Sequence, residues 1–555
     1  MTEPRATGAL DVVDLDPETL TFREVVAVAR YDAPVRIPPA VLDAVAAGRA
    51  AVDALAAADR PVYGVSTGFG ALAQRHIEPD LRTALQKSLI RSHAAGMGTE
   101  VEREVVRALM LLRARTLATG RTGVRPETLQ VYVGMLDAGI TPVVHEYGSL
   151  GCSGDLAPLS ACALAAMGEG PVRDASGALT TAAEALAAAG LEPLVLAEKE
   201  GLALVNGTDG MLGMLVMALY DLENLLSTAD LTAAMSVESQ LGTDRVFAPD
   251  LHAPLRPHPG QESSAANTFA ALADSPVVAG HKDSTHLVQD AYSLRCAPQV
   301  TGSARDTLAF AATTAARELR AAIDNPVVLP DGSVSSNGNF HGAPLAHALD
   351  FLAIVAADVA NIAERRTDRF MDVARNQGLP PFLADDAGVD SGLMIAHYTQ
   401  AAMVSEMKRR ATPASVDSIP SSAMQEDHVS MGWSAARKLR ASVADLGRVL
   451  AVEMYAAARA ADLRTAEDPH AVPGPVTGAV VAGLRERVAG PGPDRFLSPE
   501  LETVTDYVTS GAAMAAAEAV ATFRHTLTDT DGRVLDGRAP AGNGAGASAA
   551  GDVRA

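Results

Sequence analysis

The segment of residues 343–366, APLAHALDFLAIVAADVANIAERR, constrains the fold most strongly, because it is apolar on nearly every side as far as Glu364. Its proline stands in the first turn, where a helix tolerates this residue. A helix that is apolar all round must be buried in a bundle or in a subunit interface. We therefore expect this segment to pack lengthwise in a parallel or antiparallel helix bundle.

The rest of the chain also favours helices. Hydrophobic residues make up 48% of the 555 residues, alanine is abundant, and aromatic residues make up only 4%. Residues 41–60 carry apolar side chains at intervals of three and four, as an amphipathic helix does. The sequence thus predicts a mainly α fold with a smaller N-terminal mixed region. Further helical windows lie at residues 101–119, 210–240, 305–323, 430–462 and 499–527.

Strand signals are weak, and two long segments carry no clear helical pattern. PVVLPDGSV, residues 326–334, predicts a small hairpin around Asp331-Gly332. Residues 245–300 and 411–428 are predicted to be irregular, and loops of such length are usually functional or disordered. We expect an N-terminal extension, a mixed region, a helical-bundle region that forms one catalytic unit with it, and a flexible alanine- and glycine-rich tail. These cover residues 1–20, 21–230, 231–530 and 531–555.

The charge balance and the cysteine count exclude several classes of protein. The net charge is −22, from 45 basic and 67 acidic side chains, which argues against a nucleic-acid-binding surface. The apolar runs at 211–220 and 351–357 are shorter than the ~18–20 residues of a membrane span. Three cysteines cannot form a disulfide framework, and the start of the chain has no signal-peptide pattern. We expect a cytoplasmic protein with neither nucleic-acid nor membrane partners.

Familiar catalytic and metal-binding motifs are missing from the sequence. In GCSGD, Gly154 follows Ser153 directly, so the G-x-S-x-G spacing of serine hydrolases is not met. No phosphate-binding G-x-x-x-x-G-K-[ST] occurs, and YGVSTGFG, residues 63–70, has the wrong glycine spacing for a dinucleotide site. His281 and His286 have no obvious third ligand. We therefore expect no metal site.

The triplet Cys152-Ser153-Gly154 offers a different chemistry. In a tight turn, the amide nitrogen of Gly154 could attack the carbonyl carbon of residue 152, because glycine alone permits so close an approach. Loss of water would close a five-membered ring, and loss of the Ser153 hydroxyl as a second water would leave a conjugated methylene group. The product would be a strong electrophile made from the chain itself. The alternative is a plain glycine-rich start to a helix.

The surrounding sequence resembles a known family. GSLGCSGDLAPLS, residues 148–160, is similar to the signature of the aromatic amino acid ammonia-lyases, whose prosthetic group 4-methylideneimidazol-5-one (MIO) forms from an internal Ala-Ser-Gly. Further blocks resemble that family in the expected order: YGVSTGFG (63–70), SHAAGMG (92–98), LVNGTDGML (204–212), QDAYSLRCAPQV (289–300), DNPVV (324–328), SNGNFHG (336–342) and SSAMQEDHVSMG (421–432).

The resemblance implies roles for several residues. Tyr63 would be the base that removes the β-proton of the substrate, and the MIO methylene would derive from Ser153. Arg295 would bind the substrate carboxylate, since a guanidinium matches a carboxylate with two hydrogen bonds. Asn206 and Tyr292 would lie against the MIO ring or the leaving amine.

Two further residues, Gln289 and Phe340, would lie beside the substrate. Their alternative role is ordinary structural packing. The family builds each site from more than one subunit of a homotetramer, which would bring together residues as distant in sequence as Tyr63 and Glu426. Helix N-termini directed at the site would favour an electron-rich adduct.

Within the family, the resemblance is closest to the members that act on histidine. Ser92-His93 and Gln425-Glu426 stand where members acting on phenylalanine and tyrosine have other pairs. His93 and Glu426 could bond the nitrogens of an imidazole, whereas an apolar ring would leave both unpaired at a cost of roughly 1–3 kcal/mol each. The implied reaction is the conversion of L-histidine to trans-urocanate and ammonia, the first step of histidine degradation, with Glu426 among the catalytic residues.

Other functions stay open at this point. A phenylalanine or tyrosine ammonia-lyase, or an aminomutase, would share the MIO group. A helical scaffold that keeps the sequence blocks but does not cyclise belongs to another class altogether.

The chain departs from the family pattern at two positions. Cys152 replaces the common alanine, which affects the packing around the MIO group rather than its formation, and we expect its thiol to be a bystander. Ala291 stands where proline is frequent, which could loosen the loop that carries Tyr292.

Overall fold

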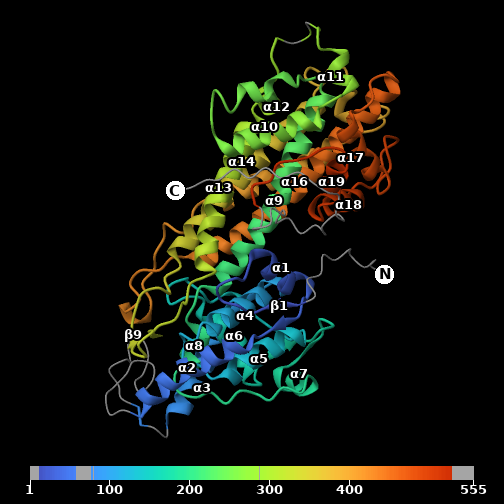
Figure 1. Cartoon of the computed structure of the whole chain (residues 1–555). Helices are drawn as coiled ribbons and strands as arrows, with labels where there is room; N and C mark the ends of the chain where they lie inside the picture. The colour runs from blue at the N-terminus through green and yellow to red at the C-terminus, as the bar shows by residue number, and fades with distance from the viewer. Residues whose placement is uncertain (1–11, 58–76, 79–80, 285, 287, 528–555) are drawn as a thin grey trace.

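The structure is a computed structural model and describes residues 12–57, 77–78, 81–284, 286 and 288–527. Long helices run along an elongated molecule and form a bundle (Figure 1). α14 packs along α16, and both α9 and α13 pack against α14. The mainly α fold with a long helix bundle is confirmed. The four longest of these helices are α9 (Asp209–Ser239), α13 (Ala297–Glu318), α14 (Ala343–Met371) and α16 (Gly432–Glu467).

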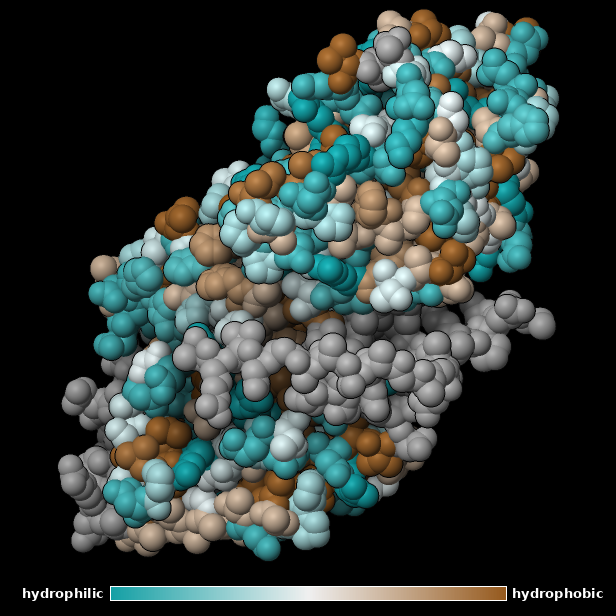
Figure 2. Space-filling view, turned by 45° about the horizontal axis from the view of Figure 1, so that its top comes forward, coloured by the Kyte–Doolittle hydropathy of each residue, from teal (hydrophilic) through white to brown (hydrophobic). Residues whose placement is uncertain are grey.

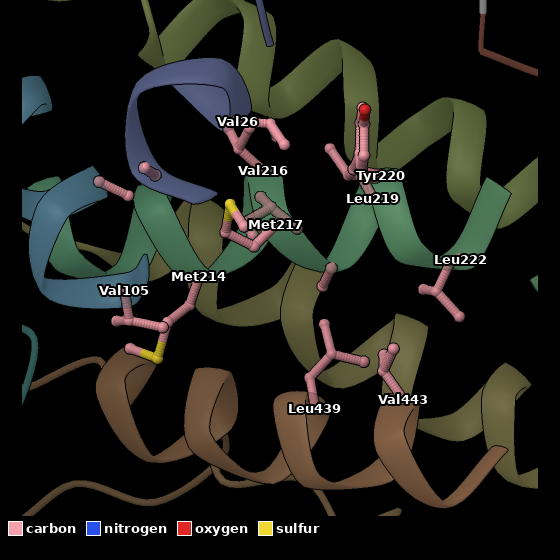
Figure 3. Close-up of a cluster of buried hydrophobic side chains, with 14 of the residues drawn as sticks. Val26, Val105, Met214, Val216, Met217, Leu219, Tyr220, Leu222, Leu439 and Val443 are labelled. Carbon is pink, nitrogen blue, oxygen red and sulfur yellow. The ribbon is translucent and has the colours of Figure 1, made fainter. Parts of the chain in front are cut away.

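α9 forms the centre of the bundle. Each of its residues except Asp221 is buried, because its apolar side chains meet a different neighbour on each side. Burial of one large aliphatic side chain stabilises the fold by roughly 1.5–3 kcal/mol. Figure 3 shows α9 side chains between those of α1, α4 and α16; the labelled residues are Val26, Val105, Met214, Val216, Met217, Leu219, Tyr220, Leu222, Leu439 and Val443.

The N-terminal helices gather at one end of the molecule, in the lower part of Figure 1. Thr21 and Glu24 form a capping box that starts α1. The sequence predicts a border between two regions at residue 230, but α9 continues through this position. The two regions therefore share one helix, and the border between them stays a prediction. The helices are α1 (Phe22–Tyr31), α2 (Pro39–Ala56), α3 (Arg82–His93), α4 (Arg103–Ala118), α5 (Pro126–Asp137), α6 (Leu156–Ala166), α7 (Ala182–Ala188) and α8 (Glu200–Val205).

The strands are short and lie mostly in this N-terminal part. β8 (Val327–Val328) and β9 (Val334–Ser335) form the hairpin that the sequence predicts at 326–334. β1 pairs with β2 in parallel, β3 pairs with β5 antiparallel, and the third sheet has the order β4-β6-β7. Their bounds are β1 (Val13–Asp14), β2 (Val35–Arg36), β3 (Met97–Glu100), β4 (Thr141–Pro142), β5 (His145–Tyr147), β6 (Pro171–Arg173) and β7 (Leu179–Thr181).

Two expectations about secondary structure were wrong. Residues 245–300 are not irregular throughout, because α10 (Pro259–Ala271) packs against α13 through small and polar residues that carry no apolar periodicity. The window 499–527 is not one helix, because Gly511, at φ +79°, separates α18 from α19. The remaining helices are α11 (Pro276–Gly280), α12 (Tyr292–Arg295), α15 (Met394–Arg410), α17 (Pro475–Arg485), α18 (Ser498–Thr509) and α19 (Ala512–Glu518).

Two helical stretches among the described residues, Glu200–Ser239 and Ala343–Met371, are long and apolar enough to cross a membrane by length and composition alone. The most apolar window of the first is completely buried, and 56% of that of the second is buried. Core helices pass the same test. The face drawn in Figure 2 mixes hydrophilic with hydrophobic residues. α14 leaves Phe351 and Ile354 partly exposed, as a helix at a subunit interface would.

Candidate active site

The loop of residues 148–155 brings close together the two backbone groups that cyclisation would join. The amide nitrogen of Gly154 lies in close contact with the carbonyl oxygen of Cys152. Gly154 has φ +81°, and a Cβ at this position would overlap the backbone of Gly207. Only glycine combines such a φ with such an approach. Residues 152–154 therefore fit the formation of a five-membered ring.

The same loop lies where the N-termini of α6, α9, α14 and α16 converge. The Gly342 amide at the start of α14 donates to the carbonyl oxygen of Gly151 at 2.9 Å, and the Met431 amide at the start of α16 donates to that of Leu150 at 2.9 Å. α6 begins directly after the loop, at Leu156. Each helix N-terminus carries roughly half a positive charge. The loop thus sits in positive potential, which favours an electrophile and electron-rich adducts on it.

Asp155 ties the loop to α9. Its carboxyl group is fully buried and accepts hydrogen bonds from the amides of Gly210 and Met211 at 2.9 and 3.0 Å, and from the Ser149 hydroxyl at 2.8 Å. Burial raises the pKa of Asp155 to about 7, although these hydrogen bonds oppose the shift. No local sequence pattern indicates this role, although Asp155 directly follows the triplet.

Glu426 lies directly against the triplet. Its Oε1 accepts a hydrogen bond from the Ser153 hydroxyl at 2.9 Å. Its Oε2 accepts from the Ser421 hydroxyl at 3.0 Å and from the Cys152 thiol at 3.5 Å. Burial and the nearby carboxyl group of Glu426 raise the pKa of Cys152 to about 12. The structure therefore brings Cys152, Ser153 and Glu426 together, and it adds Ser421, whose role no sequence pattern indicates.

His93, at the end of α3, faces the same carboxyl group. Burial lowers the pKa of His93, although the charge of Glu426 opposes this shift. The Ser92 hydroxyl donates to the carbonyl oxygen of Leu89 at 3.0 Å and lies 3.0 Å from Nδ1 of His93. The neutral ring of His93 carries one N–H donor and one acceptor nitrogen, and the Ser92 hydroxyl lies beside only Nδ1.

Asn206 lies on the other side of the triplet. The Asp155 amide, next in the chain to Gly154, donates to the carbonyl oxygen of Gly207 at 2.7 Å. Nδ2 of Asn206 donates to the carbonyl oxygen of Asn325 at 2.9 Å, whereas its buried Oδ1 accepts no hydrogen bond from the described residues. An unpartnered buried oxygen costs free energy, so it suits a bound ligand.

Phe340 and Gln425 lie at the same end of the bundle. Phe340 precedes His341, which stacks on His428 with ring centroids 5.2 Å apart. Gln425 is exposed beside Glu426. A cavity of about 700 Å³ opens beside the start of α14; its lining includes Arg121, Glu318, Asn339, His341 and Pro344, but none of residues 148–155.

The structure does not bring Gln289, Tyr292 and Arg295 to the triplet within one chain. Arg366 of α14 donates to the carbonyl oxygen of Ser293 at 3.4 Å, which places α12 near the opposite end of α14 from Gly342. Positions 342 and 366 are about 36 Å apart at ~1.5 Å per helical residue.

Within the α12 segment, Arg295 lies 4.8 Å from the ring centroid of Tyr292, and its buried Nε has no hydrogen-bond partner among the described residues. Tyr292 is 72% exposed and Gln289 is also exposed. Ala291 has φ −63°, the value that proline would fix, so this position keeps the conformation of the family pattern. The expected base, Tyr63, lies outside the described residues.

Comparison with known proteins shows the family of this chain. The sequence pattern described as aromatic amino acid lyase matches residues 20–486, most of the chain. This chain belongs to the aromatic amino acid lyase family. It is therefore an MIO-dependent lyase whose prosthetic group forms from its own residues, and the Gly154 amide lies in close contact with the Cys152 carbonyl group.

The curated relatives of this aromatic amino acid lyase include histidine ammonia-lyases. It is 65% identical to the histidine ammonia-lyase of Streptomyces griseus over 501 residues, which cover 90% of this chain and 97% of that protein. It is 63% identical to that of Streptomyces coelicolor over 502 residues, again with 90% and 97% covered.

Solved structures with the same fold include lyases and aminomutases. The histidine ammonia-lyase of Trypanosoma cruzi matches with a TM-score of 0.84 and 36% identity, over 92% of this chain and 96% of that one. The tyrosine aminomutase of Streptomyces globisporus matches with a TM-score of 0.86 and 35% identity, over 92% and 99%. The fold therefore does not separate these two activities.

Proposed function

We propose that this aromatic amino acid lyase is a histidine ammonia-lyase, which eliminates ammonia from L-histidine to give trans-urocanate. The observation that carries the proposal is the 65% identity with the Streptomyces griseus histidine ammonia-lyase along nearly its whole length. The solved lyase and the solved aminomutase match this chain almost equally well, at 36% and 35% identity. The structures therefore do not distinguish the two activities, and the proposal depends on the sequence relatives.

The polar groups around the triplet support an imidazole substrate. A neutral imidazole has one donor and one acceptor, so the carboxyl group of Glu426 can accept from its N–H while the N–H of His93 donates to its other nitrogen. A phenyl ring would leave both groups without partners, at a cost of roughly 1–3 kcal/mol each. These two groups thus favour histidine over phenylalanine or tyrosine.

The remaining steps need an electrophile, a base and a carboxylate clamp. The MIO group supplies an electrophile that makes the amino group a better leaving group. Tyr63 removes the β-proton of the substrate, and its phenol, with an ordinary pKa of ~10, needs positive potential such as the converging helix N-termini provide. Arg295 binds the carboxylate with two hydrogen bonds. Asn206 and Tyr292 orient the amine, and Gln289, Phe340 and Gln425 line the substrate.

A complete site requires more than one subunit. α12, with Tyr292 and Arg295, lies near one end of α14 and the triplet near the other, so these residues can meet only across an interface. The partly exposed Phe310 of α13 and Phe351 of α14, with ring centroids 6.1 Å apart, form an apolar surface for such a contact. We propose a homotetramer with shared active sites, located in the cytoplasm.

A substrate panel tests this function. The purified protein is incubated separately with L-histidine, L-phenylalanine and L-tyrosine, and the ultraviolet absorbance of urocanate, cinnamate and coumarate is followed. We expect urocanate as the main product. Cinnamate or coumarate as the main product, or a β-amino acid by chromatography, would assign one of the alternative activities. An inactive protein with an unmodified triplet would indicate a non-catalytic scaffold.

A further inference from the structure

We propose that Cys152 and Ser421 are positioning residues that hold Oε2 of Glu426, so that Oε1 faces the substrate once Ser153 has lost its hydroxyl group. This inference rests on the proposed histidine ammonia-lyase function. It gives the cysteine of the triplet a role, whereas the sequence suggests a bystander.

The two oxygens of Glu426 have different partners. Oε1 accepts only from the Ser153 hydroxyl, at 2.9 Å, among the described residues. Oε2 accepts from the Ser421 hydroxyl at 3.0 Å and from the Cys152 thiol at 3.5 Å. Two side chains therefore hold Oε2 of Glu426, whereas Oε1 is bonded by the hydroxyl group that cyclisation removes.

Cyclisation removes the partner of Oε1. The Ser153 Cβ–O bond breaks and the Cα proton leaves, so that the hydroxyl group and this proton depart as water while a Cα=Cβ double bond forms. No hydroxyl remains at residue 153 to donate to Oε1. The acceptor capacity of this oxygen is then unused, and the N–H of a substrate imidazole can occupy it.

Both partners of Oε2 persist through that step. Ser421 faces Glu426 across a short backbone pairing, in which the Ser421 amide donates to the carbonyl oxygen of Glu426 at 2.9 Å and the Glu426 amide donates back at 3.3 Å. Cys152 contributes only its backbone to the ring, so its thiol remains. It is buried in a small cluster with Val429 and Met431.

The thiol remains a donor at neutral pH. Burial and the neighbouring Glu426 raise the pKa of Cys152 to about 12, so the sulfur keeps its proton. An alanine at this position would leave Oε2 with the Ser421 hydroxyl alone. The carboxyl group of Glu426 would then be less firmly oriented. The affinity for an imidazole should fall, whereas cyclisation should proceed as in the wild type.

The test compares Cys152→Ala, Cys152→Ser and Ser421→Ala with the wild type. Cys162→Ala is the matched control, because Cys162 on α6 is also buried but is not a hydrogen-bond partner of Glu426. Three quantities are measured: the mass of the peptide that contains the triplet, the Kd of trans-urocanate by calorimetry, and kcat and KM for L-histidine.

We expect every variant to show the mass loss of two water molecules. Cys152→Ala and Ser421→Ala should each weaken urocanate binding and raise KM roughly threefold to tenfold, which corresponds to one hydrogen bond. Cys152→Ser should keep both values close to those of the wild type, because a hydroxyl group also donates a hydrogen bond. Cys162→Ala should leave both values unchanged.

A spectroscopic readout checks the thiol contact without turnover. In a Raman difference spectrum between the wild type and Cys152→Ala, the S–H stretching band of Cys152 should lie at the lower frequency of a hydrogen-bonded thiol. Glu426→Gln, which weakens the acceptor, should shift this band upward. A band at the frequency of a free thiol in the wild type would contradict the contact.

The outcomes separate the inference from the proposed function. If the wild type releases urocanate but Cys152→Ala and Ser421→Ala bind it as tightly as the wild type, the inference is wrong and the function stands. An equal loss in Cys162→Ala, or no recovery in Cys152→Ser, also overturns it. If the wild type neither binds urocanate nor forms it from L-histidine, the proposed function itself fails.

Discussion

The carbonyl oxygen of Gly151 accepts a hydrogen bond from the amide of Gly342 at 2.9 Å, which fixes the cyclising loop to the first residues of α14. Near the opposite end of that helix, Arg366 bonds the backbone of Ser293 in α12. About 36 Å of helix therefore separates the two groups of site residues. The roles proposed for Ser153 and Arg295 therefore require two chains for one site.

Mixed subunits should restore activity that neither variant has alone. Ser153→Ala lacks the electrophile and Arg295→Ala lacks the carboxylate clamp, so each homo-oligomer should lose most of its turnover. In a mixed oligomer, a site can combine Ser153 of one subunit with Arg295 of another. We expect urocanate formation to rise well above that of either variant after the two are dissociated and reassembled together.

Lack of recovery in such mixed oligomers, confirmed as mixed by mass spectrometry, would show that the two groups do not meet across an interface. Wild-type subunits that are dissociated and reassembled under the same conditions serve as the control, because they show how much activity the procedure itself recovers.

Gly154→Ala should prevent cyclisation. Gly154 has φ +81°, and an added Cβ would overlap the backbone of Gly207, so the loop would have to move and the amide of residue 154 would leave the carbonyl group of Cys152. We expect an unmodified peptide and loss of nearly all turnover.

Gly177→Ala provides the matched control. Gly177 has φ +85°, but nothing lies within 4 Å of an added Cβ. The backbone strain alone costs about 1–3 kcal/mol, so this variant should melt slightly earlier and still carry the modification. If Gly154→Ala cyclised as fully as Gly177→Ala, the close approach would not be required.

His525 should make stability depend on pH. Burial opposes its charge, but hydrogen bonds to Glu223 and Glu518 outweigh burial and raise the pKa of His525 to about 9. Because an unfolded histidine has a pKa of ~6.5, the stabilisation is complete below that pH and is lost as the pH rises through 9. His525→Gln should therefore lower Tm at pH 6 and have little effect near pH 10.

The exposed His470 serves as the control for this measurement. His470→Gln should leave the dependence of Tm on pH as it is in the wild type. A Tm difference for His525→Gln that is the same at pH 6 and pH 10 would rule out the charged contact.

The sequence predicts those parts of the fold that have a strong local pattern. α14 follows from its apolar run, and the β8–β9 hairpin follows from Asp331-Gly332. α10 escapes such reasoning because its buried residues are small or polar. Asn267, for example, donates to Asp230 of α9 at 3.0 Å, a partner that no local pattern indicates.

The candidate site also has one part that the sequence predicts and another that it does not. Cys152-Ser153-Gly154 is visible as a local motif because cyclisation uses adjacent backbone groups. The bond of Ser153 to Glu426 depends on the tertiary fold, which brings the segment before α16 to the start of α6, and the bond of Ser421 to Glu426 depends on a local backbone pairing. Their orientation could not be predicted from residue types alone.

The mass of the proteolytic peptide that contains Cys152, Ser153 and Gly154 tests the central claim most directly. If the backbone itself becomes the electrophile, the peptide from active protein is lighter than its sequence by two water molecules. Ser153→Ala should lack the methylene group and be inactive. A peptide of full sequence mass from protein that converts L-histidine to urocanate would contradict the account.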